Sequence, residues 1–158
     1  MTMKRFIAIA MLMLSCSLVF AQKHYEMDLN GLEIGQTYTK EQVVARLGKP
    51  TLYRTFDDKE NGLEESYYYG EKKTTELDFQ RNGEFTFFSL AEKNMPILTK
   101  TIAGGICVGE NISAMKKVGI PYGLCKKGEY LMMFGTDFLY IWVDEKDIIT
   151  RFIYIVPD

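Results

Sequence analysis

The chain has 158 residues, which is enough for one ordinary domain or two very small ones. It carries 19 basic and 21 acidic residues with no basic run after the N-terminus, which argues against a nucleic-acid partner. The single histidine, His24, lies near the N-terminus, so catalysis by a nucleophile and a histidine base is disfavoured. We therefore expect a protein that is not an enzyme and needs no cofactor or metal.

Residues 1–21 have the pattern of a secretory signal peptide. Lys4 and Arg5 precede an apolar run, and Val19-Phe20-Ala21 forms a cleavage site. We expect a periplasmic or secreted protein that begins at Gln22, has no transmembrane span and carries a net charge of about −4. An alternative reading uses Cys16 as the acylated cysteine of an outer-membrane lipoprotein, because Leu14-Ser15-Cys16 weakly resembles a lipoprotein cleavage box.

Two cysteines, Cys107 and Cys125, remain after the signal peptide. An even number of cysteines in an exported chain favours a disulfide, which would close a loop of about 18 residues. Two reduced thiols are the alternative.

The best-defined local pattern is a short helix between Lys40 and Leu47. Thr39 and Gln42 fit a capping box, and Val43, Val44 and Leu47 form an apolar stripe. Gly48 and Pro50 then end the helix.

Four strands are expected after this helix, and the order then recurs. The first four are 51–56, 64–69, 74–80 and 84–90, with Asn82-Gly83 as a hairpin turn. A second helix, 112–118, is followed by strands at 129–134, 138–143 and 148–156. The expected fold class is α+β, with two tandem repeats, each a short helix packed on an antiparallel four-stranded meander. Repeat 1 spans 22–90, a linker spans 91–103, and repeat 2 spans 104–158.

Residues 35–50 resemble the signature of the SmpA/OmlA family, small periplasmic lipoproteins of outer-membrane assembly. The resemblance rests on Gly35-x-Thr37, Val43 and Leu47-Gly48-x-Pro50, and more faintly on residues 109–121. Two extra residues between Thr37 and the helix depart from the family pattern. The family is related in fold to the β-lactamase inhibitor protein, itself a tandem of two helix-plus-sheet units. The resemblance implies a binding module without enzymatic activity, which presents one face of a curved sheet to another protein.

The expected strand register predicts which side chains share a face. A two-residue turn at Asn82-Gly83 pairs Phe79 with Thr86 and Leu77 with Phe88, and the same register applies to the second repeat. The face turned away from the helices then holds Glu76, Asp78 and Ile153 and the expected partner-binding residues, which are Phe85, Phe87, Tyr140, Trp142, Ile149 and Arg151.

The composition of this face predicts binding of an envelope or secreted protein. Trp142 and Arg151 lie directly across from each other, and Trp, Tyr and Arg are typical of interface hot spots. Two alternatives stay open at this point: a glycan or lipid in a groove between the repeats, and a homodimer that covers the face.

Overall fold

A computed structural model describes residues 26–58 and 62–157. The predicted signal peptide, Cys16 and His24 lie outside the described residues. The elements, in chain order, are β1 (Asp28–Leu29), β2 (Leu32–Glu33), α2 (Lys40–Leu47), β3 (Leu52–Asp58), β4 (Gly62–Tyr69), β5 (Thr75–Phe79), β6 (Phe85–Leu90), the 3₁₀ helix η1 (Ile112–Val118), β7 (Tyr122–Lys126), β8 (Glu129–Phe134), β9 (Asp137–Val143) and β10 (Ile149–Ile155).

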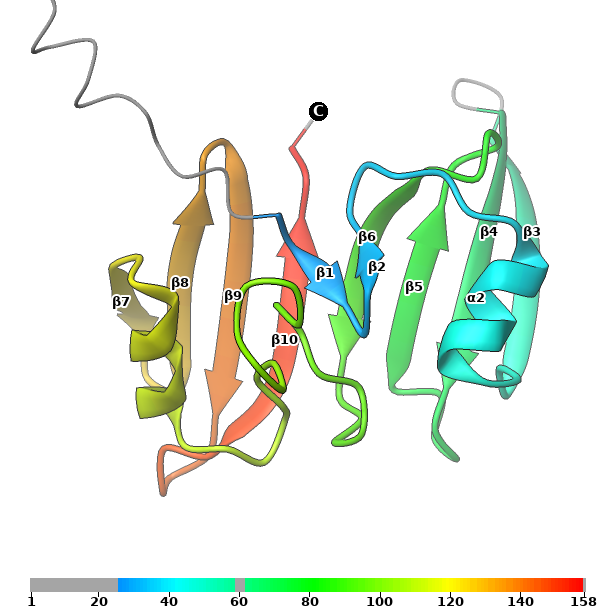
Figure 1. Cartoon of the computed structure of the whole chain (residues 1–158). Helices are drawn as coiled ribbons and strands as arrows, with labels where there is room; N and C mark the ends of the chain where they lie inside the picture. Colours follow the sequence, from blue (N-terminus) through cyan, green and yellow to red (C-terminus); the bar gives the residue numbers. More distant parts are fainter. Residues whose placement is uncertain (1–25, 59–61, 158) are drawn as a thin grey trace, which may run out of the picture.

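Eight strands form one antiparallel sheet, in the order β3-β4-β5-β6-β10-β9-β8-β7. The two sequence-consecutive groups of four strands join where β6 pairs with β10, with Leu90 opposite Phe152 and Phe88 opposite Tyr154. We call this β6–β10 pairing the seam. It places the last strand of the chain in the middle of the sheet, as Figure 1 shows.

The prediction of two helix-plus-four-strand repeats was wrong. The seam makes a single continuous sheet, so neither group of strands is a separate layer. The expected second helix is a 3₁₀ helix of seven residues, and β1 and β2 form an additional two-stranded sheet. Edge-to-edge pairing of strands distant in sequence leaves no local signal, because the same alternation of side chains suits an edge strand and a central one.

One face of the sheet is covered by all the remaining elements. Figure 1 shows α2, the β1–β2 hairpin, the segment between β6 and η1, and η1 itself on the same side. The segment expected to be a linker contributes Ile97 and Leu98, both fully buried, and Ile97 bridges Leu29 and Ile106. The opposite face has no such cover among the described residues, and we call it the open face.

The helix α2 confirms the sequence prediction in its bounds and in its cap. The Gln42 backbone N–H donates to Thr39 Oγ1, and Gln42 Oε1 accepts from the Thr39 backbone N–H at 2.8 Å. Val43 is the buried residue of this helix and fixes its position against the sheet.

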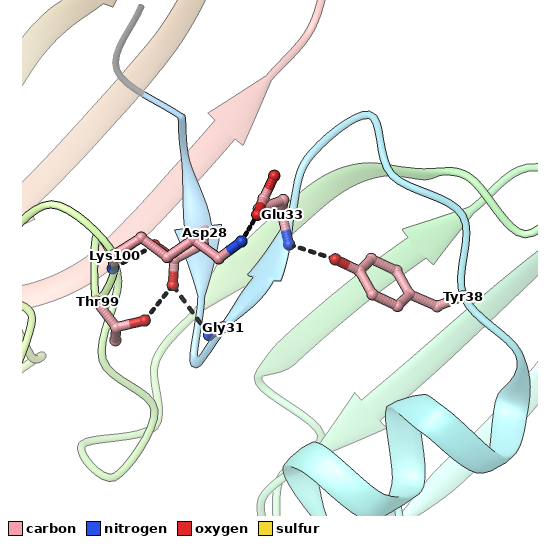
Figure 2. A network of polar contacts seen from close by, with 6 residues as sticks. All are labelled: Asp28, Gly31, Glu33, Tyr38, Thr99 and Lys100. Atoms are coloured by element: carbon pink, nitrogen blue, oxygen red, sulfur yellow. Dashed lines mark hydrogen bonds and ion pairs between the residues drawn. The ribbon is translucent and has the colours of Figure 1, made fainter.

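A polar network anchors the β1–β2 hairpin to the segment that follows β6 (Figure 2). The buried Asp28 carboxylate accepts hydrogen bonds from the Gly31 N–H (2.9 Å), the Thr99 hydroxyl (2.5 Å) and the Lys100 N–H (3.1 Å). The Lys100 ammonium pairs with Glu33. These contacts join residues about 70 positions apart, so the network closes the covered side over the seam.

Aromatic rings run through the core from one group of strands to the other. In order across the covered face, the contacting rings are Tyr53, Tyr67, Phe79, Phe85, Phe88, Tyr154 and Phe134. Phe88 and Tyr154 stack across the seam with ring centroids 5.7 Å apart. Because the series does not stop at the seam, both halves of the sheet share one core.

The predicted disulfide was wrong, since both described cysteines are free. Cys125 lies on β7, the edge strand of the sheet, whereas Gly109, two residues after Cys107, bonds to Ile149 of β10. The two thiols therefore belong to different parts of the fold, Cys107 in the segment beside β10 and Cys125 on a strand three positions away in the sheet.

Candidate protein-binding site on the open sheet face

Phe85 does not lie on the open face, where the sequence placed it. Phe85 is fully buried and stacks on Phe79 with ring centroids 4.8 Å apart. The predicted two-residue turn at Asn82-Gly83 was wrong, because the Gln80 N–H donates to the Glu84 carbonyl and the turn spans residues 81–83. Phe79 therefore pairs with Phe85 rather than with Thr86, and a bulge between Asp78 and Phe79 restores the predicted pairing of Leu77 with Phe88. The extra residue reverses the alternation of side chains at this end of β6.

Ile149 is the second correction, and it has the same cause. Its side chain is 1% exposed, and the register shifts between Ile149 and Arg151. Thr150 is the additional residue, and its hydroxyl donates to the Trp142 carbonyl at 3.2 Å. In the same way, the Thr86 hydroxyl donates to the Asp78 carbonyl at 3.4 Å.

Both bulged strands begin by pairing with the segment that leads into a helix. The Gly35 N–H donates to the Phe85 carbonyl, and the Gly109 N–H donates to the Ile149 carbonyl, each at 2.8 Å. In turn, the Phe85 N–H donates to the Gln36 carbonyl, and the Ile149 N–H donates to the Glu110 carbonyl. These bonds hold Phe85 and Ile149 under the preceding segments, which explains their burial.

The predicted pair of Trp142 and Arg151 is present. The two residues are register partners, and the Arg151 guanidinium lies 5.7 Å from the centroid of the Trp142 ring. Arg151 also donates to the Ser89 hydroxyl at 2.9 Å across the seam. The side chain of Trp142 is 40% exposed, so the ring is ordered by its neighbours while one part stays accessible.

Apolar side chains continue from Trp142 along two rows of the open face, where a row is a set of register partners on neighbouring strands. Ile153 of β10 pairs with Tyr140, which pairs with Leu131 of β8. We define the apolar patch by its exposed or half-buried members, which are Phe87, Leu131, Met133, Phe138, Tyr140, Trp142, Ile153 and Ile155. Met133 is 52% exposed and Ile155 is 37% exposed. A contiguous patch of this kind on a sheet face is typical of an interaction surface.

The same rows become acidic on β5 and carry hydroxyl groups on β4. Ile155 pairs with Phe87, and Phe87 pairs with Asp78, which pairs with Ser66. The Ser66 hydroxyl donates to the Asp78 carboxylate at 2.6 Å. One row away, the Tyr68 hydroxyl donates to the Glu76 carboxylate at 2.7 Å. We call Glu76 and Asp78 the acidic pair.

Asp78 titrates above the usual range of a carboxyl group. Burial raises the pKa of Asp78 to about 6, with additional repulsion from Glu76 and Glu64, against the opposing effect of the hydrogen bond from Ser66. Asp78 is therefore charged at neutral pH and takes up a proton in mildly acidic solution.

An apolar groove lies at the β7 edge of the sheet. It has a volume of about 570 Å³ and continues from the apolar patch through Leu131 and Met133. The other lining residues are Ile120, Pro121, Tyr122, Gly123, Leu124 and Cys125. Within residues 26–58 and 62–157, no group of three or more histidine, cysteine, aspartate or glutamate side chains could hold a metal ion.

Sequence reasoning found part of this site. Phe87, Tyr140, Trp142 and Arg151 are half-buried or exposed on the open face, as expected. Four residues of the patch were missed. The placement of Leu131 and Met133 depends on the β8–β9 register, and Phe138 and Ile155 form the next pair of the β9–β10 register beyond Tyr140 and Ile153. The sequence does carry a usable signal: the tight turn at Gly135-Thr136 pairs Phe134 with Asp137, and the β8–β9 register follows from that pair.

Comparisons with known proteins leave the family of this chain open. No family model matches the chain, and no curated protein matches it. One solved structure that is similar is an extracellular protein containing an SCP domain from Bacillus anthracis, with a TM-score of 0.46 and 13% sequence identity. The match covers 77% of this chain and 43% of that chain, so this chain corresponds to less than half of that protein. No helix within the described residues is both long and apolar enough to cross a membrane.

Proposed function

We propose that this chain is an exported, non-enzymatic binding protein that engages an envelope or secreted protein through its open sheet face. The observation that carries the proposal is the apolar patch, which includes Trp142 with Arg151 against its ring and lies on a face that no described element covers. Ordered aromatic and arginine side chains on a rigid sheet lose little conformational entropy on binding, so they supply affinity efficiently.

The sequence supports the exported location and the non-enzymatic character in this proposal. Residues 1–21 have the pattern of a signal peptide, and the only histidine is His24. The resemblance of residues 35–50 to the SmpA/OmlA family points the same way, toward a module that binds other envelope proteins.

Site-specific photo-crosslinking tests the proposal. The mature chain, residues 22–158, would carry p-benzoylphenylalanine in place of Trp142 and be exposed to envelope and secreted fractions of the source cells. The matched control carries the same group in place of Leu63, which is 38% exposed but lies on β4, two residues before the Glu65 that pairs with the buried Phe79, and so belongs to the covered side of the sheet. We expect a specific heterologous adduct from position 142 that is absent from position 63.

The partner identified in this way permits a quantitative test. Trp142→Ala should weaken its binding by roughly 30-fold, the effect of a typical hot-spot truncation, whereas Leu63→Ala should leave affinity unchanged. Identical adducts from both positions would contradict the assigned face. An adduct of the chain with itself alone would show a homodimer instead.

Small-ligand binding is a second candidate, favoured by the apolar groove at the β7 edge. Its volume falls in the range of small-molecule sites, and Pro121, Leu124 and Met133 give it an apolar lining suited to a lipid chain. The groove lies at the edge of the sheet rather than between the two halves, where the sequence placed it. A fatty acid that raises the melting temperature of wild type but not of Met133→Glu would support this function.

A further inference from the structure

The acidic pair adjoins the apolar patch but has no cationic partner of its own. The ion pairs within residues 26–58 and 62–157 join Lys100 to Glu33, Lys117 to Glu110 and Lys126 to Glu129. In the same part of the chain, the hydrogen bonds to the acidic pair come from the hydroxyl groups of Ser66 and Tyr68. These neutral donors orient the carboxylates and leave their negative charge in place.

Arg54 and Arg151 lie on the open face, and both contact groups other than the acidic pair. The Arg54 guanidinium lies 5.9 Å from the ring centroid of Tyr68. Arg151 lies over Trp142 and donates to Ser89. The face therefore presents uncompensated negative charge on β5 next to apolar side chains on β6, β10 and β9.

The spacing of these features defines what a complementary surface must carry. Asp78 is one strand from Phe87 and two strands from Ile155 along a single row of paired residues. Adjacent strands are about 4.8 Å apart, so an anchoring cation and an anchoring apolar group would be separated by roughly 5–10 Å. Neighbouring side chains of one partner segment span this distance.

We propose that the open face binds a protein segment that places a lysine or arginine against Glu76 and Asp78 and apolar side chains on the apolar patch. This inference rests on the proposed function and specifies the chemistry of its partner. Charge complementarity next to an apolar anchor gives both specificity and a fast encounter. A second copy of this chain fits less well, because its own acidic pair would have to be accommodated in the same interface.

Such binding depends on pH through Asp78. The charged groups that face its carboxylate are Glu64 on β4 and Glu76 on its own strand, and Tyr68 on β4 is also nearby. The neighbours on β6 are uncharged. The guanidinium of Arg54 on β3 lies over the Tyr68 ring. A partner cation favours the ionised form and lowers the pKa of Asp78 below about 6 in the complex. Affinity is therefore full above pH 6 and falls as the solution is acidified below it.

Selection from a display library of random 12-residue peptides tests the partner chemistry without knowledge of the natural ligand. The mature wild-type chain would be the immobilised target at pH 7.5. We expect enrichment of lysine or arginine next to aromatic or aliphatic residues. The affinity of the selected peptides should fall about tenfold or more in Asp78→Asn and in Glu76→Gln, and remain unchanged in Glu145→Gln, an exposed control on the β9–β10 turn.

Measuring the affinity of the selected peptides at two pH values separates charge recognition from general apolar binding. Wild type should bind the selected peptides about tenfold more weakly at pH 5.0 than at pH 7.5, whereas Asp78→Asn should show a smaller change. The urea denaturation midpoints of all variants serve as the folding control. If Asp78→Asn is unfolded under the assay conditions, Asp78→Ser takes its place.

The outcomes distinguish this inference from the proposed function. Peptides that lose affinity in Trp142→Ala but not in Asp78→Asn or Glu76→Gln would overturn the inference and leave the open face as a binding site. Peptides insensitive to Trp142→Ala, or a library without binders, would contradict both. A dimer in sedimentation that Trp142→Ala dissociates would assign the face to a second copy and overturn the inference.

Discussion

At the scale of single residues, Asp78 and Trp142 occupy corresponding places in the two halves of the sheet. Each carbonyl accepts a bond from the bulge threonine of the neighbouring strand, Thr86 or Thr150. Asp78 is opposite Phe87, whereas Trp142 is opposite Arg151. The same backbone arrangement therefore places a charged side chain opposite an aromatic ring twice. In the first half the charge is on β5 and the ring on β6, whereas in the second half the ring is on β9 and the charge on β10.

Asp78→Asn should stabilise the protein at neutral pH. The pKa of Asp78 is about 6 in the folded state and ordinary in the unfolded chain, so the ionised carboxylate destabilises the fold above pH 6. We expect the variant to be more stable by on the order of 2 kcal/mol at pH 7.5, after allowance for partial exposure of the group. This advantage should shrink toward pH 4.5, where wild type is protonated.

Urea denaturation at both pH values measures this difference directly. The comparison of the two proteins cancels the contributions of carboxyl groups that they share. An equal stability difference at pH 7.5 and pH 4.5 would contradict the raised pKa of Asp78.

Thiol labelling should distinguish the two described cysteines. Cys125 is exposed on the edge strand, whereas burial, together with Glu110, raises the pKa of the half-buried Cys107. Because the thiolate is the reactive form, iodoacetamide at pH 8 should modify Cys125 faster than Cys107. Peptide mass mapping over time provides the measurement, with the urea-unfolded chain as the control in which both react alike. Faster modification of Cys107 in the folded protein would contradict this assignment.

At the scale of elements, turns and caps fix where each strand begins. Gly83 has a φ of +82°, and a Cβ added there would come within 2.6 Å of the Tyr38 carbonyl oxygen. The Tyr38 N–H donates to the Gly83 carbonyl, so the hairpin turn and the start of α2 are built against each other. This contact places α2 over the covered face and leaves the open face to the sheet alone.

The anchor of the β1–β2 hairpin should be the most sensitive polar site of the covered side. Asp28→Ala leaves three partly buried donors, from Gly31, Thr99 and Lys100, without their acceptor. We expect a loss of roughly 3 kcal/mol or more in the free energy of unfolding. Glu145→Ala, at the exposed β9–β10 turn, serves as the control and should cost less than about 0.5 kcal/mol.

Hydrogen exchange locates the effect of Asp28→Ala within the molecule. Protection of the Lys100 amide should fall by more than the global loss of stability predicts, because its acceptor is removed. Unchanged protection at Lys100 would show that the carboxylate does not hold this segment.

At the scale of the whole molecule, the seam makes the two halves one cooperative unit. Phe88 and Tyr154 stack across it, and the buried Leu90 and Phe152 are register partners there. Proteins with a single shared core of this size unfold in one transition. A rigid, continuous sheet also keeps the acidic pair and the apolar patch at a fixed separation, which the proposed recognition requires.

Trp142 is the only tryptophan in the chain and reports on the second half. Phe79→Ala removes a buried ring from the first half, at a cost of about 3–5 kcal/mol. We expect the urea transition followed by Trp142 fluorescence to shift as much as the transition followed by far-ultraviolet circular dichroism. A fluorescence transition that stays at the wild-type midpoint would show that the halves unfold independently.

The sequence by itself determined the local elements and much of the face pattern. The bounds of α2 and the pairing of Trp142 with Arg151 follow from caps and from the alternation of side chains, which act within a few residues. Only the tertiary structure decided the seam, the two bulges that bury Phe85 and Ile149, and the separation of Cys107 from Cys125. Each of these depends on a strand or segment distant in sequence, and the energy of such pairing is absent from any local pattern of residues.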